Sequence, residues 1–132
     1  MENEKIDYYS KLIAKVSEVE TFSDMVIRLA REKNLTSTEV YKNAGIDAKH
    51  YSKIISDRKY QPKKSTVLAF AVGMKLNEAD SSFLLEKAGY SFNPSNTFDE
   101  IIRVFIKNGV YDRQTIDSVM SALNLPLLPS NW

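Results

Sequence analysis

The sequence of 132 residues contains no cysteine, one histidine, four glycines and four prolines. The lack of cysteine excludes disulfides, thiolate zinc sites, iron–sulfur clusters and cysteine nucleophiles. The longest apolar run, residues 67–72, is far shorter than the ~20 residues that a membrane-spanning helix needs. The chain begins with the acidic Met1-Glu2-Asn3-Glu4, without the basic and apolar regions of a signal peptide. These absences predict a cytoplasmic protein without a membrane partner.

Motifs for catalysis are also missing. The sequence has no glycine-rich phosphate loop, no nucleophile elbow and no spacing typical of metal ligands. The adjacent carboxylates Asp99 and Glu100 lie at an expected helix start, where capping and the helix dipole explain them. We therefore expect a binding protein, with neither enzymatic activity nor a cofactor or metal site.

The charges that are present are unevenly distributed along the chain. Eighteen basic and 17 acidic side chains give a formal net charge of +1. Residues 41–64, however, contain seven lysines and arginines and two aspartates, so this segment has a charge of +5. A local basic segment is typical of a surface that binds a polyanion. A solvated lysine-rich face is the alternative at this point.

Helical spacing of apolar residues recurs along the chain, whereas no segment alternates long enough to predict a strand. The fold class is therefore expected to be all-α. Capping-box spacing starts at Thr21, Thr36 and Thr97. Asp47, Asn77 and Asp112 are expected as single N-caps, and Gly45, Gly73, Gly89 and Gly109 as left-handed residues that end helices. The expected helices are 3–18, 22–33, 37–44, 48–56, 64–73, 78–88, 98–108 and 113–123.

These elements fall into three parts. Residues 1–20 form an N-terminal amphipathic helix, residues 21–90 a helical domain, and residues 91–132 a C-terminal helical extension packed on the core. For the apolar stripe of the first helix we expect packing within the molecule, with a dimer contact as the alternative; the stripe consists of Ile6, Tyr9, Ile13 and Val16. The last eight residues contain two prolines and cannot be helical throughout.

Residues 37–56 predict a short helix, a tight turn with Gly45 at its centre, and a second short helix. Apolar side chains fall where two steeply crossing helices would meet, at Val40, Ala44, Ile46, Tyr51 and Ile54. This spacing is the helix-turn-helix pattern. Together with the neighbouring helices and the basic loop 57–64, residues 22–90 resemble the Cro/lambda-repressor-like, or XRE, helix-turn-helix family. The resemblance implies a five-helix core, extended here by an N-terminal helix and a C-terminal helical pair.

In that family the second helix of the motif lies in the DNA major groove. The resemblance therefore implies that four side chains face base edges: Ala48, Lys49, Ser52 and Lys53. It also implies a set of phosphate contacts, to which we add His50 of the second helix; the set is Ser37, Thr38, His50, Arg58, Lys59, Lys63 and Lys64. The expected function is that of a DNA-binding transcriptional regulator, repressor-like, which reads double-stranded DNA as a homodimer.

The sequence departs from the family pattern at several positions. Tyr41 occupies a position that is usually alanine, and Tyr51 is larger than the usual residue. The face expected to read bases lacks Arg, Gln and Asn. Tyr41, the Ile54–Ile55 pair and the apolar C-terminal tail favour an alternative. The same fold would then serve as a protein-binding module, such as an antitoxin, a phage-encoded inhibitor or an adaptor, with a protein partner.

Overall fold

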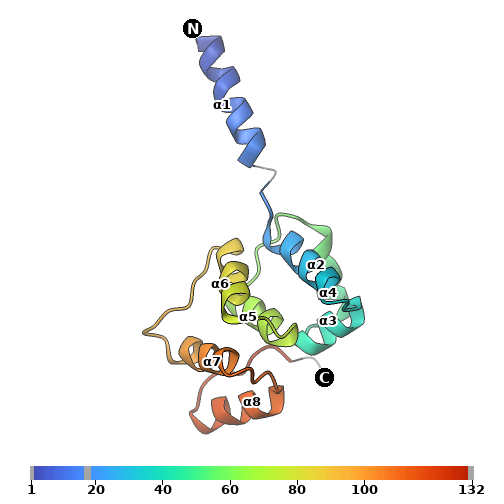
Figure 1. Ribbon diagram of the computed structural model, residues 1–132, viewed down its shortest axis with the longest axis vertical. Coiled ribbons are helices and arrows are strands. Elements are labelled where there is room, and N and C mark those ends of the chain that lie inside the picture. Colours follow the sequence, from blue (N-terminus) through green and yellow to red (C-terminus); the bar gives the residue numbers. More distant parts are fainter. Residues whose placement is uncertain (1, 17–18, 131–132) are drawn as a thin grey trace.

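The computed structural model describes residues 2–16 and 19–130, although the side chain of Val16 is not described. Its regular secondary structure in these residues is entirely helical, in agreement with the expected fold class (Figure 1). The helices are α1 (Glu2–Val16), α2 (Phe22–Glu32), α3 (Ser37–Ala44), α4 (Ala48–Ser56), α5 (Lys64–Gly73), α6 (Glu78–Lys87), α7 (Thr97–Lys107) and α8 (Arg113–Ala122). None of the helices in the described part combines the length and apolarity that spanning a bilayer requires.

Side-chain caps explain why most helices begin where the sequence predicts. Reciprocal capping boxes start α2 at Thr21 and α3 at Thr36. The predicted single caps Asp47, Asn77 and Asp112 also accept backbone N–H groups of the helices that they start. The prediction for Thr97 is wrong. Asn96 caps α7 by accepting the N–H of Asp99, which places Thr97 inside the helix.

Gly73 has a different role from the other three glycines. Gly45, Gly89 and Gly109 have the predicted positive φ angles, of 72°, 83° and 67°. Gly73 is instead the last helical residue of α5, and the left-handed residue that follows is Lys75. A Cβ atom on Gly73 would lie 2.7 Å from the backbone nitrogen of Ala44. The absence of a side chain at this position therefore allows the end of α5 to contact the backbone of α3.

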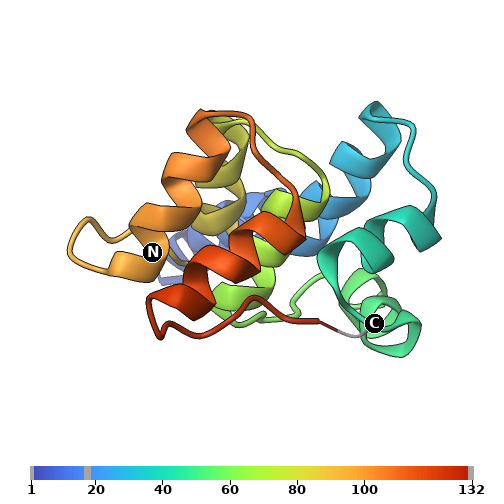
Figure 2. The ribbon, with the colours of Figure 1, turned by 90° about the horizontal axis from the view of Figure 1, so that it is seen from below.

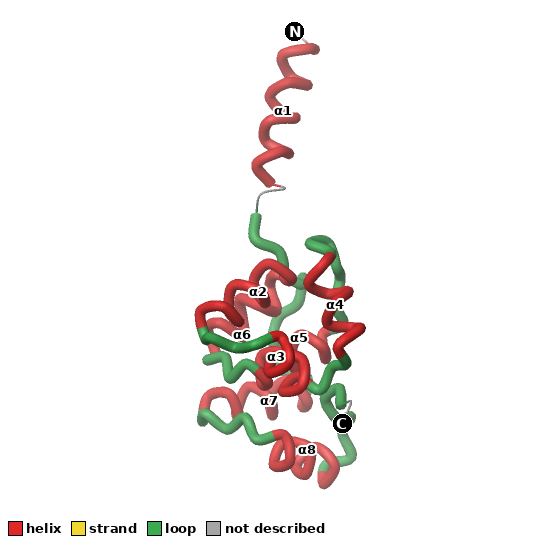
Figure 3. Tube along the Cα trace, turned by 90° about the vertical axis from the view of Figure 1, so that its right-hand side faces the viewer, coloured by secondary structure: helices red, strands yellow, loops and turns green. Residues whose placement is uncertain are grey.

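The hydrophobic core is organised around α5. Every residue of α5 from Thr66 to Gly73 is buried, which is consistent with its continuous apolar sequence. Phe70 contacts both Phe22 of α2 and Tyr51 of α4, with ring-centroid distances of 5.8 and 6.2 Å. The apolar faces of α2, α3, α4 and α6 thus close around one central helix (Figure 3).

Side chains from α7, α8 and the C-terminal tail belong to the same core. Ile102, Ile116 and Leu128 are buried in the cluster that also contains Phe22 and Phe70. The tail runs from α8 toward α3 and α4 (Figure 2). Residues 22–128 consequently share one hydrophobic core, in which the C-terminal helices cover a face of the preceding ones.

The helix α1 stands apart from this body (Figure 1). All of its side chains from Glu2 to Lys15 are exposed. The expectation that its apolar stripe packs within the molecule is therefore wrong for Ile6, Tyr9 and Ile13, and Val16 lies outside the described side chains. The apolar stripe correctly predicts an amphipathic helix, but the periodicity of a sequence does not reveal which surface the helix contacts.

Candidate nucleic-acid interface

A sharp turn joins α3 and α4. Gly45 adopts the left-handed conformation and donates its N–H to the carbonyl of Lys42, and Asp47 then caps α4 by accepting the N–H of His50 at 2.6 Å. The apolar residues predicted to lie between the two helices are all buried; they are Val40, Ala44, Ile46, Tyr51 and Ile54. The sequence thus places α3 and α4 against each other and against α5.

The two large tyrosines are accommodated side by side. The ring centroids of Tyr41 and Tyr51 are 5.8 Å apart. Tyr51 is buried against Phe70, and Tyr41 is half-buried at the edge of the core. Burial raises the pKa of the Tyr51 phenol, and a hydrogen bond with the Ser37 side chain opposes this rise. Both tyrosines therefore have a place in the packing of the helices.

Two polar contacts hold α4 in position. The hydroxyl of Ser23, buried in the first turn of α2, donates to the carbonyl oxygen of Ile54 at 2.6 Å. The ring Nε2 of His50 shares a hydrogen bond of 2.9 Å with the hydroxyl of Tyr60 in the following loop. His50 is half-buried as a result. Its side chain positions α4 relative to the loop, and the phosphate contact expected for it stays a prediction.

The four side chains expected to face bases are exposed on one surface of α4. We call this surface the α4 face; it consists of Ala48, Lys49, Ser52 and Lys53. Tyr51 and Ile54 point in the opposite direction, into the core. Ser37 and Thr38 are exposed in the first turn of α3. The helical period alone therefore separates the buried residues of α4 from the exposed ones.

The basic side chains of the loop after α4 divide into two groups. The guanidinium of Arg58 donates from Nη2 to Asp24 at 2.7 Å and to the carbonyl of Val19 at 3.1 Å. The ammonium of Lys64 pairs with the buried carboxylate of Asp99. Both cations, which the sequence assigns to phosphate contacts, thus hold the fold together. Lys59 and Lys63 are exposed, and they have no carboxylate within 4.0 Å among the described residues.

Lys42 is a further exposed cation that the family pattern does not indicate. It lies in the last turn of α3 and is likewise without an ion-pair partner in the part of the chain that is described. The local charge count includes this residue, and that count is the only sequence signal for it. Together with Lys49, Lys53, Lys59 and Lys63, it completes a set that we call the five free lysines.

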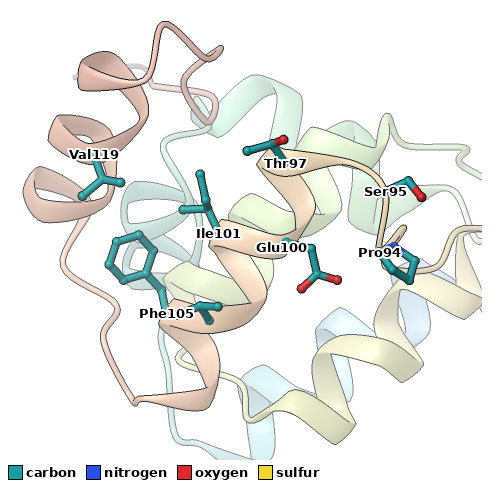
Figure 4. A pocket seen from close by; sticks show the side chains of 8 residues that line it. Pro94, Ser95, Thr97, Glu100, Ile101, Phe105 and Val119 are labelled. Carbon is teal, nitrogen blue, oxygen red and sulfur yellow. The ribbon is translucent and has the colours of Figure 1, made fainter.

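The C-terminal helices contain a separate hollow of about 400 Å³. Ile101 and Phe105 of α7 point toward Val119 of α8, while Glu100 lies on another side of α7 (Figure 4). Glu100 is the one carboxylate among the lining residues, which include no histidine or basic group. The hollow therefore lacks the pair of titratable groups that acid–base catalysis commonly uses.

Comparison of the chain with protein-family models, with curated proteins and with solved structures finds no match. The residues themselves are therefore the only basis for a functional assignment. Within residues 2–16 and 19–130, no group of three or more histidine, aspartate or glutamate side chains is arranged to hold a metal ion.

Proposed function

We propose that this protein binds double-stranded DNA through the α4 face and the loop after α4, and that it regulates transcription as a homodimer. The observation that carries the proposal is the distribution of ion pairs. Arg58 and Lys64 form ion pairs with Asp24 and Asp99, whereas the five free lysines have no acidic partner among the described residues. Exposed cations without an ion-pair partner, concentrated in residues 42–63, attract a polyanion and release its counterions on binding.

The diameter of an α-helix such as α4 is compatible with the major groove. A helix with its side chains is about 10–12 Å across, and the groove of B-DNA is about 12 Å wide. In our proposal Lys49 and Lys53 contact base edges or phosphates, while Ala48 and Ser52 allow a close approach. Since lysine contacts guanine as a flexible point charge, we expect a modest preference for sequence.

The alternative of a protein-binding module was favoured by three features, two of which have an explanation in the packing. Tyr41 contacts Tyr51, Ile54 is fully buried, and Ile55 is half-buried against the core. The C-terminal tail inserts Leu128 into the core. Leu127 of the same tail is 51% exposed, so the packing explains Leu128 but not the whole tail. The packing of Tyr41 and of the Ile54–Ile55 pair supports DNA as the first partner to test.

The salt dependence of binding tests the phosphate contacts. Fluorescence anisotropy with mixed genomic duplexes would measure the association constant at several salt concentrations. Replacing Lys59 and Lys63 together with alanine should weaken binding to every duplex and reduce the logarithmic salt slope by about 1.8, which corresponds to two lost phosphate contacts. A control is Lys107→Ala on α7, which removes an exposed lysine outside residues 41–64 that lies 3.9 Å from a carboxylate oxygen of Glu78. The control should leave the slope unchanged.

Selection of bound fragments tests the proposed role of α4. Lys49→Ala or Lys53→Ala should alter the preferred sequence, whereas the Lys59 and Lys63 substitutions should weaken binding without altering it. If the wild-type protein retards no duplex even at low salt, DNA binding is refuted. Recovery of one stoichiometric protein partner that resists nuclease would then favour the protein-binding alternative.

A further inference from the structure

The apolar face of α1 is exposed along most of the helix. Five large side chains at helical spacing form what we call the α1 face, and 64, 60, 58, 40 and 67% of their respective surfaces are exposed; they are Ile6, Tyr8, Tyr9, Leu12 and Ile13. A single helix of 15 residues is marginally stable in water, and β-branched and aromatic residues lower its stability further. The helix therefore needs a surface that covers this face.

The charges of α1 argue against a membrane or a polyanion as this surface. The helix contains three acidic residues and three lysines, so its net charge is zero. Helices that lie on anionic membranes have a polar face rich in lysine and arginine. In α1 the polar face is mixed, and Asp7 and Lys11 form an ion pair of 3.2 Å on it.

The charges are instead complementary to the same helix in the opposite direction. The first turn contains Glu2 and Glu4, and the last turn contains Lys15. An antiparallel pair of α1 helices places the acidic turn of each copy beside the basic turn of the other and opposes the two helix dipoles. A parallel pair would bring like charges together at both ends.

We propose that the α1 face binds the α1 face of a second copy of this chain in an antiparallel arrangement. In the symmetric register that sets Glu4 opposite Lys15 of the second copy, Ile6 lies opposite Ile13 and the two-fold axis passes between Tyr9 and Ser10. Complete burial of five side chains, each exposing on the order of 100 Å², would remove about 500 Å² per helix and about 1,000 Å² in total from water. This total reaches the lower limit for a specific interface, so we expect a reversible dimer whose population depends on protein concentration.

Sedimentation across a concentration series, without nucleic acid, tests the dimer. Replacing Ile6 and Ile13 together with aspartate should yield a monomer at all concentrations. A matched control, Asn3→Asp with Ser10→Asp, adds the same charge at polar positions and should still dimerise. All variants should retain the thermal transition of the body, because the α1 face lies outside the core. A monomeric wild type, or a dimer that survives the isoleucine substitutions, would overturn the proposal.

Cysteine cross-linking tests the orientation, since the natural sequence contains no cysteine. In the antiparallel register two copies of position 6 are about 10 Å apart along the helix axes, which is too far for a disulfide. Ile6→Cys alone should therefore not form a covalent dimer, whereas a mixture of the Ile6→Cys and Ile13→Cys chains should form the mixed disulfide. The reverse result would refute the antiparallel arrangement. Since DNA is absent from both experiments, their failure would leave the proposed DNA binding open.

Discussion

At the scale of single residues, Asp24 connects the start of α2 with the loop after α4. Its carboxylate accepts hydrogen bonds from Arg58 and from the backbone N–H of Thr21. The hydrogen bond with Arg58, followed by that with Thr21, lowers the pKa of Asp24 from 3.8 to about 2. A carboxyl group whose pKa is lower in the folded state stabilises the fold only while it is ionised.

The pH dependence of stability follows from this shift. The contribution of Asp24 to the free energy of unfolding is fully present above pH 4 and is lost as the pH falls toward 2. Asp24→Asn should therefore reduce the stability of the protein at pH 6 and flatten the pH dependence between pH 4 and 2. Urea unfolding of both proteins across this range measures the difference. Equal slopes for the two proteins would contradict the role assigned to Asp24.

Contacts between residues that are distant in sequence, such as that between Asp24 and Arg58, could not be predicted from the sequence. The exposure of Lys49 and Lys53 follows from the helical period, so it could be predicted. The ion pairs of Arg58 and Lys64 join residues that are 34 and 35 positions apart, and no local pattern indicates them. The hydrogen bond between His50 and Tyr60 likewise depends on how the loop folds back on α4.

At the scale of elements, the helices could be predicted to within one or two residues because their caps are local. Thr21, Thr36 and Asp47 satisfy N–H groups within three residues, and this spacing is visible in the sequence. The roles of Gly73 and of α1 could not be predicted, because each depends on which surface lies nearby. The close contact between Gly73 and α3 requires the crossing of two helices that are distant in sequence.

The close contact between Gly73 of α5 and the backbone of α3 gives a prediction about helix packing. Alanine favours a helix over glycine by about 1 kcal/mol, but a Cβ at position 73 would meet backbone atoms of Asn43 and Ala44 at 2.7–2.9 Å. We expect Gly73→Ala to destabilise the protein by a net 1–3 kcal/mol, roughly the cost of overpacking a core. Denaturant unfolding measures this change.

A second glycine offers a control for the substitution. A Cβ at Gly109 would meet nothing within 4 Å, but its φ of +67° is unfavourable for alanine. Gly109→Ala should therefore cost only the backbone strain of about 1 kcal/mol. Gly73→Ala should in addition shift α3 and thereby weaken the proposed binding to DNA, which Gly109→Ala should leave unchanged. A Gly73→Ala protein as stable as the wild type would show that α3 moves away without cost.

At the scale of the whole molecule, Arg113 joins the C-terminal region to the end of α3. Its guanidinium, at the start of α8, donates to the carbonyl oxygen of Pro129 at 2.7 Å and to that of Leu128 at 3.2 Å. A longer contact of 3.5 Å reaches the carbonyl oxygen of Ala44 at the end of α3. The tail, α8 and α3 thus meet at one side chain, beside the buried Leu128.

A double-mutant cycle tests this connection. Deleting residues 126–132 removes the buried side chain of Leu128 and should cost about 2 kcal/mol, and Arg113→Ala should also destabilise the full-length protein. Because two of the carbonyl acceptors of Arg113 lie in the deleted segment, the two effects should be less than additive by at least 0.5 kcal/mol, roughly the threshold for coupled residues. Arg103→Ala, which removes ion pairs with Glu78 and Glu100, is the control and should be additive with the deletion. Additivity of Arg113→Ala with the deletion would show that this arginine acts independently of the tail.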